Sequence, residues 1–149
     1  AMGSALIRRR AIAAASFPET LPFDEDTIFW AVLLLRARAV TVACSVLIYN
    51  VDDVRMERRF TAASIRDLLV ISEELDKLVG LGIELDIISW RKAWLARRIA
   101  RALIRQRQYG RAAIFMRLAT AQHPRIRYNR TTLWYWAKIC ANSALRRGR

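Results

Sequence analysis

Three consecutive acidic residues, Asp24, Glu25 and Asp26, are the part of this sequence best suited to chemistry. They follow a proline-containing loop and precede the apolar run at residues 28–35. Asp24 is a favourable N-cap, so the pattern predicts that the carboxylates lie at the start of a buried helix, whose dipole stabilises each ionised form by about 0.3–1 kcal/mol. An ionised carboxylate at a loop edge can act as a general base. Acids in a first helical turn also serve simply as caps and dipole partners.

The surrounding residues predict both helix and strand. Residues 28–35 are apolar on nearly every side, which is typical of a buried helix. Residues 39–51 are rich in β-branched side chains and predict one or two strands. After Phe60 the sequence predicts only helices. Their expected ranges are 62–79, ended by Gly80 and Gly82, and then roughly 86–108, 110–122 and 131–146.

Three segments follow one another in an informative order. Residues 3–9 read Gly-Ser-Ala-Leu-Ile-Arg-Arg, residues 22–30 read Pro-Phe-Asp-Glu-Asp-Thr-Ile-Phe-Trp, and residues 45–51 read Ser-Val-Leu-Ile-Tyr-Asn-Val. This order resembles the second half of family 2 glycosyltransferases of the GT-A fold. In that family a Gly-Ser-Ala-hydrophobic-Arg-Arg segment precedes a Phe-Asp-Glu stretch, a Glu-Asp pair that opens a helix, and a strand that ends at a tyrosine.

The resemblance implies a role for each matching residue. Asp26 would be the base that takes the proton from the acceptor hydroxyl as this oxygen attacks the anomeric carbon of the sugar with inversion. Glu25 would orient the site, and Trp30 would support it from the helix. The backbone of Gly3 and Ser4 would line the acceptor cleft. The donor would be a nucleotide sugar, and the acceptor a glycan or a lipid-linked sugar.

Two departures from the family pattern concern the metal and the activity. The family's Asp-x-Asp metal motif and its first nucleotide-binding strands belong upstream of residue 1, so a divalent metal, Mn²⁺ or Mg²⁺, is expected only for the full-length enzyme. Many members carry a histidine shortly after the tyrosine, where this sequence has Asp52. Asp52 either replaces that histidine near the metal or lies in a solvated turn. This polypeptide by itself is predicted to have no transferase activity.

Charge is distributed unevenly along the chain. The net charge is +13, yet all thirteen acidic residues lie between Glu19 and Asp86. Residues 87–149 hold sixteen Lys and Arg residues and no acid, which indicates a boundary near residue 87. All but three of the basic residues in the chain are arginine. Arginine suits phosphate recognition because its guanidinium group donates two parallel hydrogen bonds, but a GC-rich genome produces the same bias.

The basic helices favour an anionic partner. In the helix expected at 86–108, apolar residues from Trp90 to Leu103 share one side, and Arg97, Arg101 and Arg105 lie beside them at intervals of four. Such a face can lie on an anionic membrane surface. Two alternatives stay open: the apolar residues form the core of a helical hairpin while the arginines are solvated, or the helices bind nucleic acid. Nucleic acid ranks below the membrane because no motif of a nucleic-acid-binding fold is present.

Composition and segment lengths restrict the class of protein. Hydrophobic residues make up 54% of the chain, which is typical of a globular domain. The longest apolar run, residues 28–35, is too short to span a membrane. Cys44 and Cys140 have neither paired spacing nor a neighbouring histidine, so no zinc site or disulfide framework is indicated. These features favour a cytoplasmic protein, peripheral on the inner face of the membrane if the basic helices bind lipid.

The sequence thus predicts an α+β chain that is mostly α. Residues 1–60 are expected to be the closing portion of a GT-A α/β domain, and residues 61–149 a basic helical extension with a hairpin like that of a tetratricopeptide repeat. The expected function is that of the C-terminal part of an inverting glycosyltransferase. The alternative is a non-enzymatic, all-helical basic adaptor that binds nucleic acid or a partner protein. The two differ at residues 39–51, where only the first requires a sheet.

Overall fold

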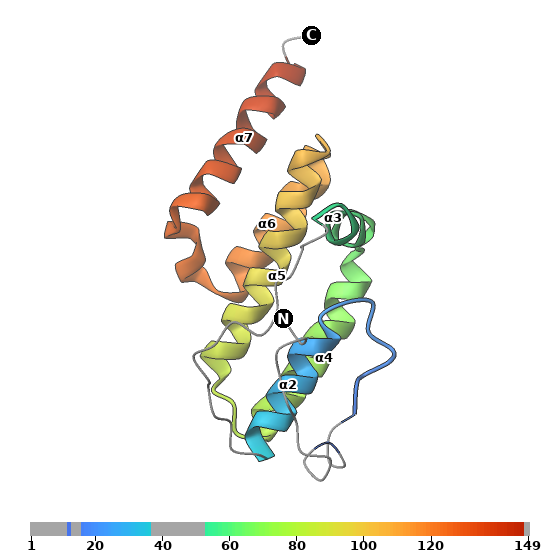
Figure 1. Ribbon diagram of the computed structural model, residues 1–149. Helices are drawn as coiled ribbons and strands as arrows, with labels where there is room; N and C mark the ends of the chain where they lie inside the picture. Colours follow the sequence, from blue (N-terminus) through green and yellow to red (C-terminus); the bar gives the residue numbers. More distant parts are fainter. Residues whose placement is uncertain (1–11, 13–15, 37–52, 148–149) are drawn as a thin grey trace, which may run out of the picture.

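The computed structural model describes residues 12, 16–36 and 53–147, and the regular elements of residues 16–36 and 53–147 are helices (Figure 1). The elements are α2 (Glu25–Arg36), α3 (Asp53–Ala62), α4 (Ile65–Gly80), α5 (Leu85–Arg105), α6 (Tyr109–Gln122), the 3₁₀ helix η2 (Pro124–Tyr128) and α7 (Arg130–Arg147). The helices predicted after Phe60 are confirmed to within a few residues. Helix α3 was not predicted.

The predicted fold class is wrong: the described residues form an all-helical arrangement, with no strand that could belong to the closing portion of a GT-A domain. The physical reason lies in what covers the apolar helix α2. Its side chains Ile28, Phe29 and Leu33 are buried, and among the described elements α2 packs on α4, a helix, where the predicted domain requires a sheet. Residues 39–51, which were predicted to form strands, lie outside the described residues.

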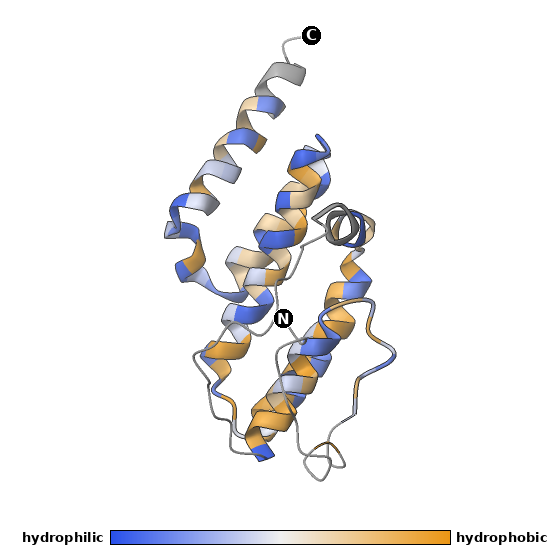
Figure 2. Cartoon of the chain, viewed as in Figure 1, coloured by the Kyte–Doolittle hydropathy of each residue, from blue (hydrophilic) through white to orange (hydrophobic). Residues whose placement is uncertain are grey.

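Helix α5 joins the two parts of the bundle. It packs on α4 and α3 and, most extensively, on α6, and α7 lies against both α5 and α6 (Figure 1). Alanines make the close approach of α5 and α6 feasible, because Ala96, Ala100, Ala112 and Ala119 are fully buried between larger apolar residues. Apolar residues of α5 such as Ile99 belong to this core, and Figure 2 shows the mixture of hydrophobic and hydrophilic residues along each helix.

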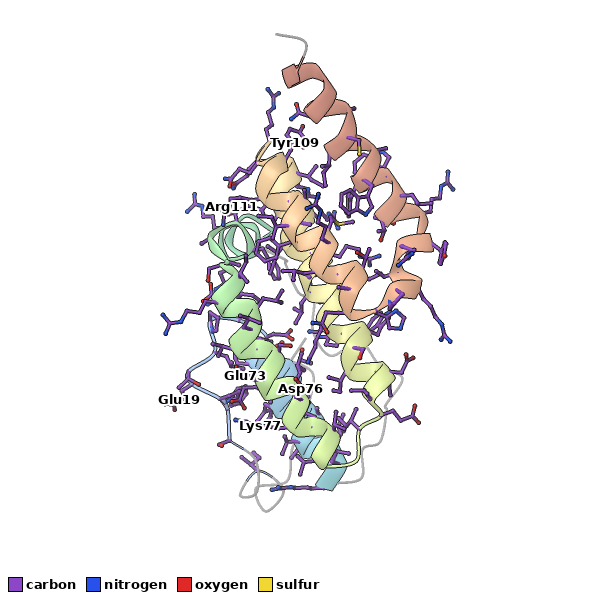
Figure 3. All side chains as sticks on the ribbon, turned by 180° about the vertical axis from the view of Figure 1, so that it is seen from behind. Glu19, Glu73, Asp76, Lys77, Tyr109 and Arg111 are labelled. Carbon is purple, nitrogen blue, oxygen red and sulfur yellow. The ribbon has the colours of Figure 1, made fainter. Side chains whose placement is uncertain are left out.

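Polar contacts along the first half of α5 fix it to the neighbouring helices. Lys92 donates a hydrogen bond to Asp76 of α4 at 2.6 Å, and Figure 3 shows Asp76 on that helix. The guanidinium carbon of Arg98 lies 4.9 Å from the centroid of the Phe60 ring in α3, and within α5 the guanidinium carbons of Arg91 and Arg98 lie 4.4 and 4.7 Å from the centroid of the Trp94 ring. These cations therefore stabilise the fold by pairing with an acid or an aromatic ring.

No helix in the described parts of the chain is long and apolar enough to cross a membrane.

Candidate functional site: an acidic helix start and a basic pocket

Asp24 anchors the start of α2 to α5. It adopts a φ of +67°, which turns the chain sharply before Glu25. Arg91 donates from Nε to Asp24 Oδ2 at 3.2 Å and makes a close contact from Nη2 to Asp24 Oδ1. The Thr27 hydroxyl joins this network, donating to Asp24 Oδ1 at 3.0 Å and accepting from Arg91 at 2.6 Å. Asp24 is therefore a buried structural anchor, and its carboxylate is already occupied.

Burial raises the pKa of Asp24 above its ordinary value. The hydrogen bonds and positive charge of Arg91, together with the hydrogen bond from Thr27, act in the opposite direction, and the charge of Asp26 adds slightly to the rise. The desolvation of a carboxylate whose side chain is only 7% exposed outweighs the pairing. The pair thus consists of a largely buried acid and a partly exposed arginine.

Asp26 and Glu25 lie in the first turn of α2, as the sequence predicted. Asp26 is exposed, and its Oδ1 accepts a hydrogen bond from the Thr27 amide at 2.8 Å. Glu25 and Trp30 are half-buried, and the Trp30 ring meets Phe29 edge-on with centroids 5.5 Å apart. Asp26 therefore remains accessible to a substrate, while its neighbours are partly covered. None of these side chains lines the pocket between α5, α6 and α7 that is described below.

The predicted acceptor and metal residues can be placed only in part. Gly3, Ser4 and Asp52 lie outside the described residues. Within the described ranges no three His, Cys, Asp or Glu residues lie close enough together to hold a metal ion. Asp24 and Asp26 are two positions apart, but Arg91 binds both oxygens of Asp24. The carboxylates seen here do not fit a metal site.

A basic pocket of about 500 Å³ lies between the end of α5, the start of α6 and one side of α7. The residues that line it are Arg101, Ile104, Arg105, Arg107, Tyr109, Thr131, Trp134, Tyr135 and Lys138. Four of them are cationic, three are aromatic and none is acidic. A cavity of this size is typical of small-molecule sites. Figure 3 shows Tyr109 at the end of the α5–α6 hairpin that points away from α2.

Regular spacing on α7 supplies one wall of the pocket. Thr131, Trp134, Tyr135 and Lys138 recur at intervals of three and four, so they share one face of the helix. Lys138 Nζ lies 3.9 Å from the centroid of the Trp134 ring. The Trp134 side chain is 52% exposed, whereas Tyr135 is buried. This wall therefore combines an accessible aromatic ring with a cation beside it.

Arg107 reaches the pocket from a strained backbone position. The turn after α5 is closed by two amides: Arg107 N donates to Ile104 O at 3.0 Å, and Gln108 N donates to Leu103 O at 2.9 Å. This Schellman motif places Arg107 in the left-handed region, with a φ of +58°, where glycine is strongly preferred. This backbone conformation costs an arginine conformational free energy that a glycine at the same position would not lose.

The sequence-based prediction identified part of this pocket. It singled out Arg101 and Arg105, which line it, and Arg97, which does not. Several apolar residues expected on the same membrane-facing side are buried against neighbouring helices instead, which agrees with the alternative of a hairpin core. The lining residues that sequence reasoning missed are Ile104, Arg107, Tyr109, Thr131 and Lys138. The spacing on α7 was a readable signal for the last two, but the turn residues become neighbours of α7 only through tertiary packing.

No family model, curated protein or solved structure matches this chain.

Proposed function

We propose that this chain supplies the acceptor-activating carboxylate of an inverting, sugar-transferring enzyme. The observation that carries the proposal is the contrast between Asp24, buried and bound by Arg91, and Asp26, exposed in the first turn of the same helix. The order of motifs in the sequence supports the same assignment of Asp26. The proposal concerns this site and not the GT-A fold, which the described helices do not form.

In the proposed reaction, the Asp26 carboxylate accepts the proton of an acceptor hydroxyl while that oxygen attacks the anomeric carbon. The nucleotide leaves from the opposite face, and the configuration at that carbon inverts. Asp26 lies in the first turn of α2, and the Asp24–Arg91 anchor keeps the helix start in place. Glu25, in the same turn, would orient the acceptor. The nucleotide itself would be held by residues outside the described part of the chain.

The proposed place of action is the cytoplasmic face of a membrane. The acid-free stretch from residue 87 onward supports this, because clustered basic residues bind anionic lipid headgroups. Such docking would bring the enzyme to a lipid-linked acceptor. A divalent metal is expected for the full-length enzyme, and none of the steps above is assigned to it.

The genomic sequence directly upstream of Ala1 tests this proposal. An open frame that encodes a strand followed by Asp-x-Asp would support it, whereas an in-frame stop codon there would contradict it. In the polypeptide extended by that frame, Asp26→Asn should lower kcat by about 10²- to 10⁴-fold, as expected for loss of a general base. Glu73→Gln, an exposed acid on α4, is the matched control and should retain activity. The 149-residue chain by itself, mixed with sugar nucleotide, Mn²⁺ and acceptor, should show no turnover.

A second candidate function is that of a helical adaptor for nucleic acid or an acidic partner protein. It is favoured by the all-helical arrangement together with the sixteen basic residues after Asp86. Binding to a single-stranded oligonucleotide should then weaken steeply as salt is raised, because counterions are released on binding. Liposomes containing anionic lipid provide the comparison. Binding to oligonucleotides without any binding to liposomes would favour the adaptor over the membrane-docked enzyme.

A further inference from the structure

We propose that the pocket between α5, α6 and α7 binds a small ligand that carries a diphosphate group next to an apolar or ring-shaped portion. This inference does not depend on sugar transfer, since it rests only on the pocket itself. The site would use Arg101, Arg107 and Lys138 for the diphosphate and Trp134 for the rest of the ligand.

The positive charge of the pocket favours the binding of an anion. Four cationic side chains line it and no acidic one does. No acid occurs after Asp86 in the sequence, so α6 and α7 contribute no side-chain carboxylate to the pocket. Near the start of α5, by contrast, Arg91 and Lys92 are paired with Asp24 and Asp76. A ligand with several phosphate oxygens would accept charge-assisted hydrogen bonds from Arg101, Arg107 and Lys138.

The backbone around the pocket also favours an anion. Helix α6 begins at Tyr109, a lining residue, and its positive end lacks a side-chain cap. The Gln108 side chain contacts Gln106 and Arg111 instead, at 3.1 and 2.8 Å. At the end of α5, two of the last carbonyls accept hydrogen bonds from the turn, which reduces their negative influence on the pocket. The positive end of α6 therefore adds to the charge of the side chains, whereas the C-terminal end of α5 partly opposes it.

The aromatic residues and the volume restrict the rest of the ligand. Trp134 presents an exposed ring next to Lys138, and Tyr109 is half-buried at the opposite wall. Such rings can stack on a nucleobase or pack on an isoprenoid chain. About 500 Å³ accommodates a molecule of this size. A small diphosphate ester thus fits the pocket better than a duplex or a protein surface does.

Calorimetric titration with three probes tests the proposal: inorganic pyrophosphate, uridine diphosphate and geranyl diphosphate. The expected result is that the unmodified chain binds one of the esters at least about tenfold more tightly than pyrophosphate, since the attached group gains contact with the aromatic wall. Tighter binding of the uridine ester identifies a nucleotide as the source of the diphosphate. Tighter binding of the geranyl ester identifies a lipid. Absence of binding of all three probes at millimolar concentration would overturn the inference.

Matched variants distinguish the pocket from a diffuse positive field. Arg101→Gln and Lys138→Gln should each weaken ester binding by about tenfold, because each removes a charge-assisted hydrogen bond. Arg97 lies one turn before Arg101 on α5 and does not line the pocket. Arg97→Gln therefore removes the same charge outside the pocket and should change binding by less than about twofold. All three side chains are at least partly exposed, and circular dichroism checks that each variant is folded. Equal losses in Arg97→Gln and Arg101→Gln would contradict a specific site.

Discussion

At the scale of single residues, position within one helical turn decides what a carboxylate can do. Asp24 and Asp26 are chemically identical and only two residues apart. Arg91 and Thr27 engage Asp24 in the interior, while Asp26 faces solvent with a hydrogen bond to one backbone amide. A structural role for Asp24 follows from its burial and pairing, whereas Asp26 stays accessible for the role proposed above.

The first prediction concerns the pH dependence that Asp24 imposes on stability. Burial raises its pKa above the ordinary value of 3.8, so the folded protein holds this proton more tightly than the unfolded chain does. The stabilising contribution is therefore complete below about pH 4 and decreases as the pH rises through the raised value. The free energy of unfolding of the unmodified chain minus that of Asp24→Asn, measured by urea titration, should be larger at pH 4 than at pH 7. An increase toward pH 7 would mean that pairing with Arg91 outweighs burial.

At the scale of elements, two helices end in the same way with different residues. Both α4 and α5 finish in a Schellman motif; Gly82 occupies the left-handed position after α4, with a φ of +100°, and Arg107 occupies it after α5. The start of α4 is fixed as well, by a reciprocal capping box between Ser64 and Asp67. Local chemistry therefore determines the ends of α4 fully, whereas the end of α5 contains one residue that local preference disfavours.

The second prediction follows from the left-handed backbone at Gly82. Gly82→Ala should lower the free energy of unfolding by about 1 kcal/mol, because a β-carbon is strained at this φ even though space is available. Gly80→Ala is the matched control, since Gly80 lies in the last turn of α4, has no positive φ and also has open space around it. Thermal unfolding followed by circular dichroism measures both. A loss of equal size at the two glycines would contradict the backbone argument.

The third prediction concerns Arg107. Replacing it with glycine relieves the left-handed strain, so Arg107→Gly should raise the free energy of unfolding by up to about 1 kcal/mol. The same substitution removes one cation from the pocket and should weaken diphosphate binding. A gain in stability with a loss of binding indicates that the strain is retained for the ligand. If stability drops instead, the arginine side chain contributes contacts that stabilise the turn.

At the scale of the whole molecule, close packing of α5 against α6 holds the pocket residues in place. Arg101, Arg105 and Tyr109 belong to the end of this hairpin, and α7 supplies the remaining wall. The alanines between the two helices set their separation. A change in that separation would displace both ends of the hairpin, so core packing and pocket geometry should vary together.

The fourth prediction tests this packing. Ala100 is fully buried, so Ala100→Leu should lower the free energy of unfolding by about 1–3 kcal/mol through overpacking. Ala121→Leu, on an exposed position of α6, is the control and should change stability by less than about 0.5 kcal/mol. Chemical denaturation measures both variants. Equal stability of the two variants would show that the α5–α6 interface can expand to accept the larger side chain.

The sequence alone determined most of the helical elements, because their signals are local. Apolar periodicity, the Asp-Glu-Asp start of α2 and the two glycines at the end of α4 each act within a few residues. The helices from α4 to α7 agree with the ranges that these signals predicted. Helix α3 was missed because its ten residues are mostly polar, so no run of apolar residues marks the segment.

Only the tertiary structure decided how these elements combine. The apolar surface of α2 could have been covered by a sheet or by a helix, and composition does not distinguish the two; packing on α4 does. The burial of Asp24 depends on Arg91, 67 residues away in the chain. The pocket likewise joins a turn at Arg107 to a helix that begins at Arg130. Contacts between residues distant in sequence arise from the packing of whole helices, which no local pattern encodes.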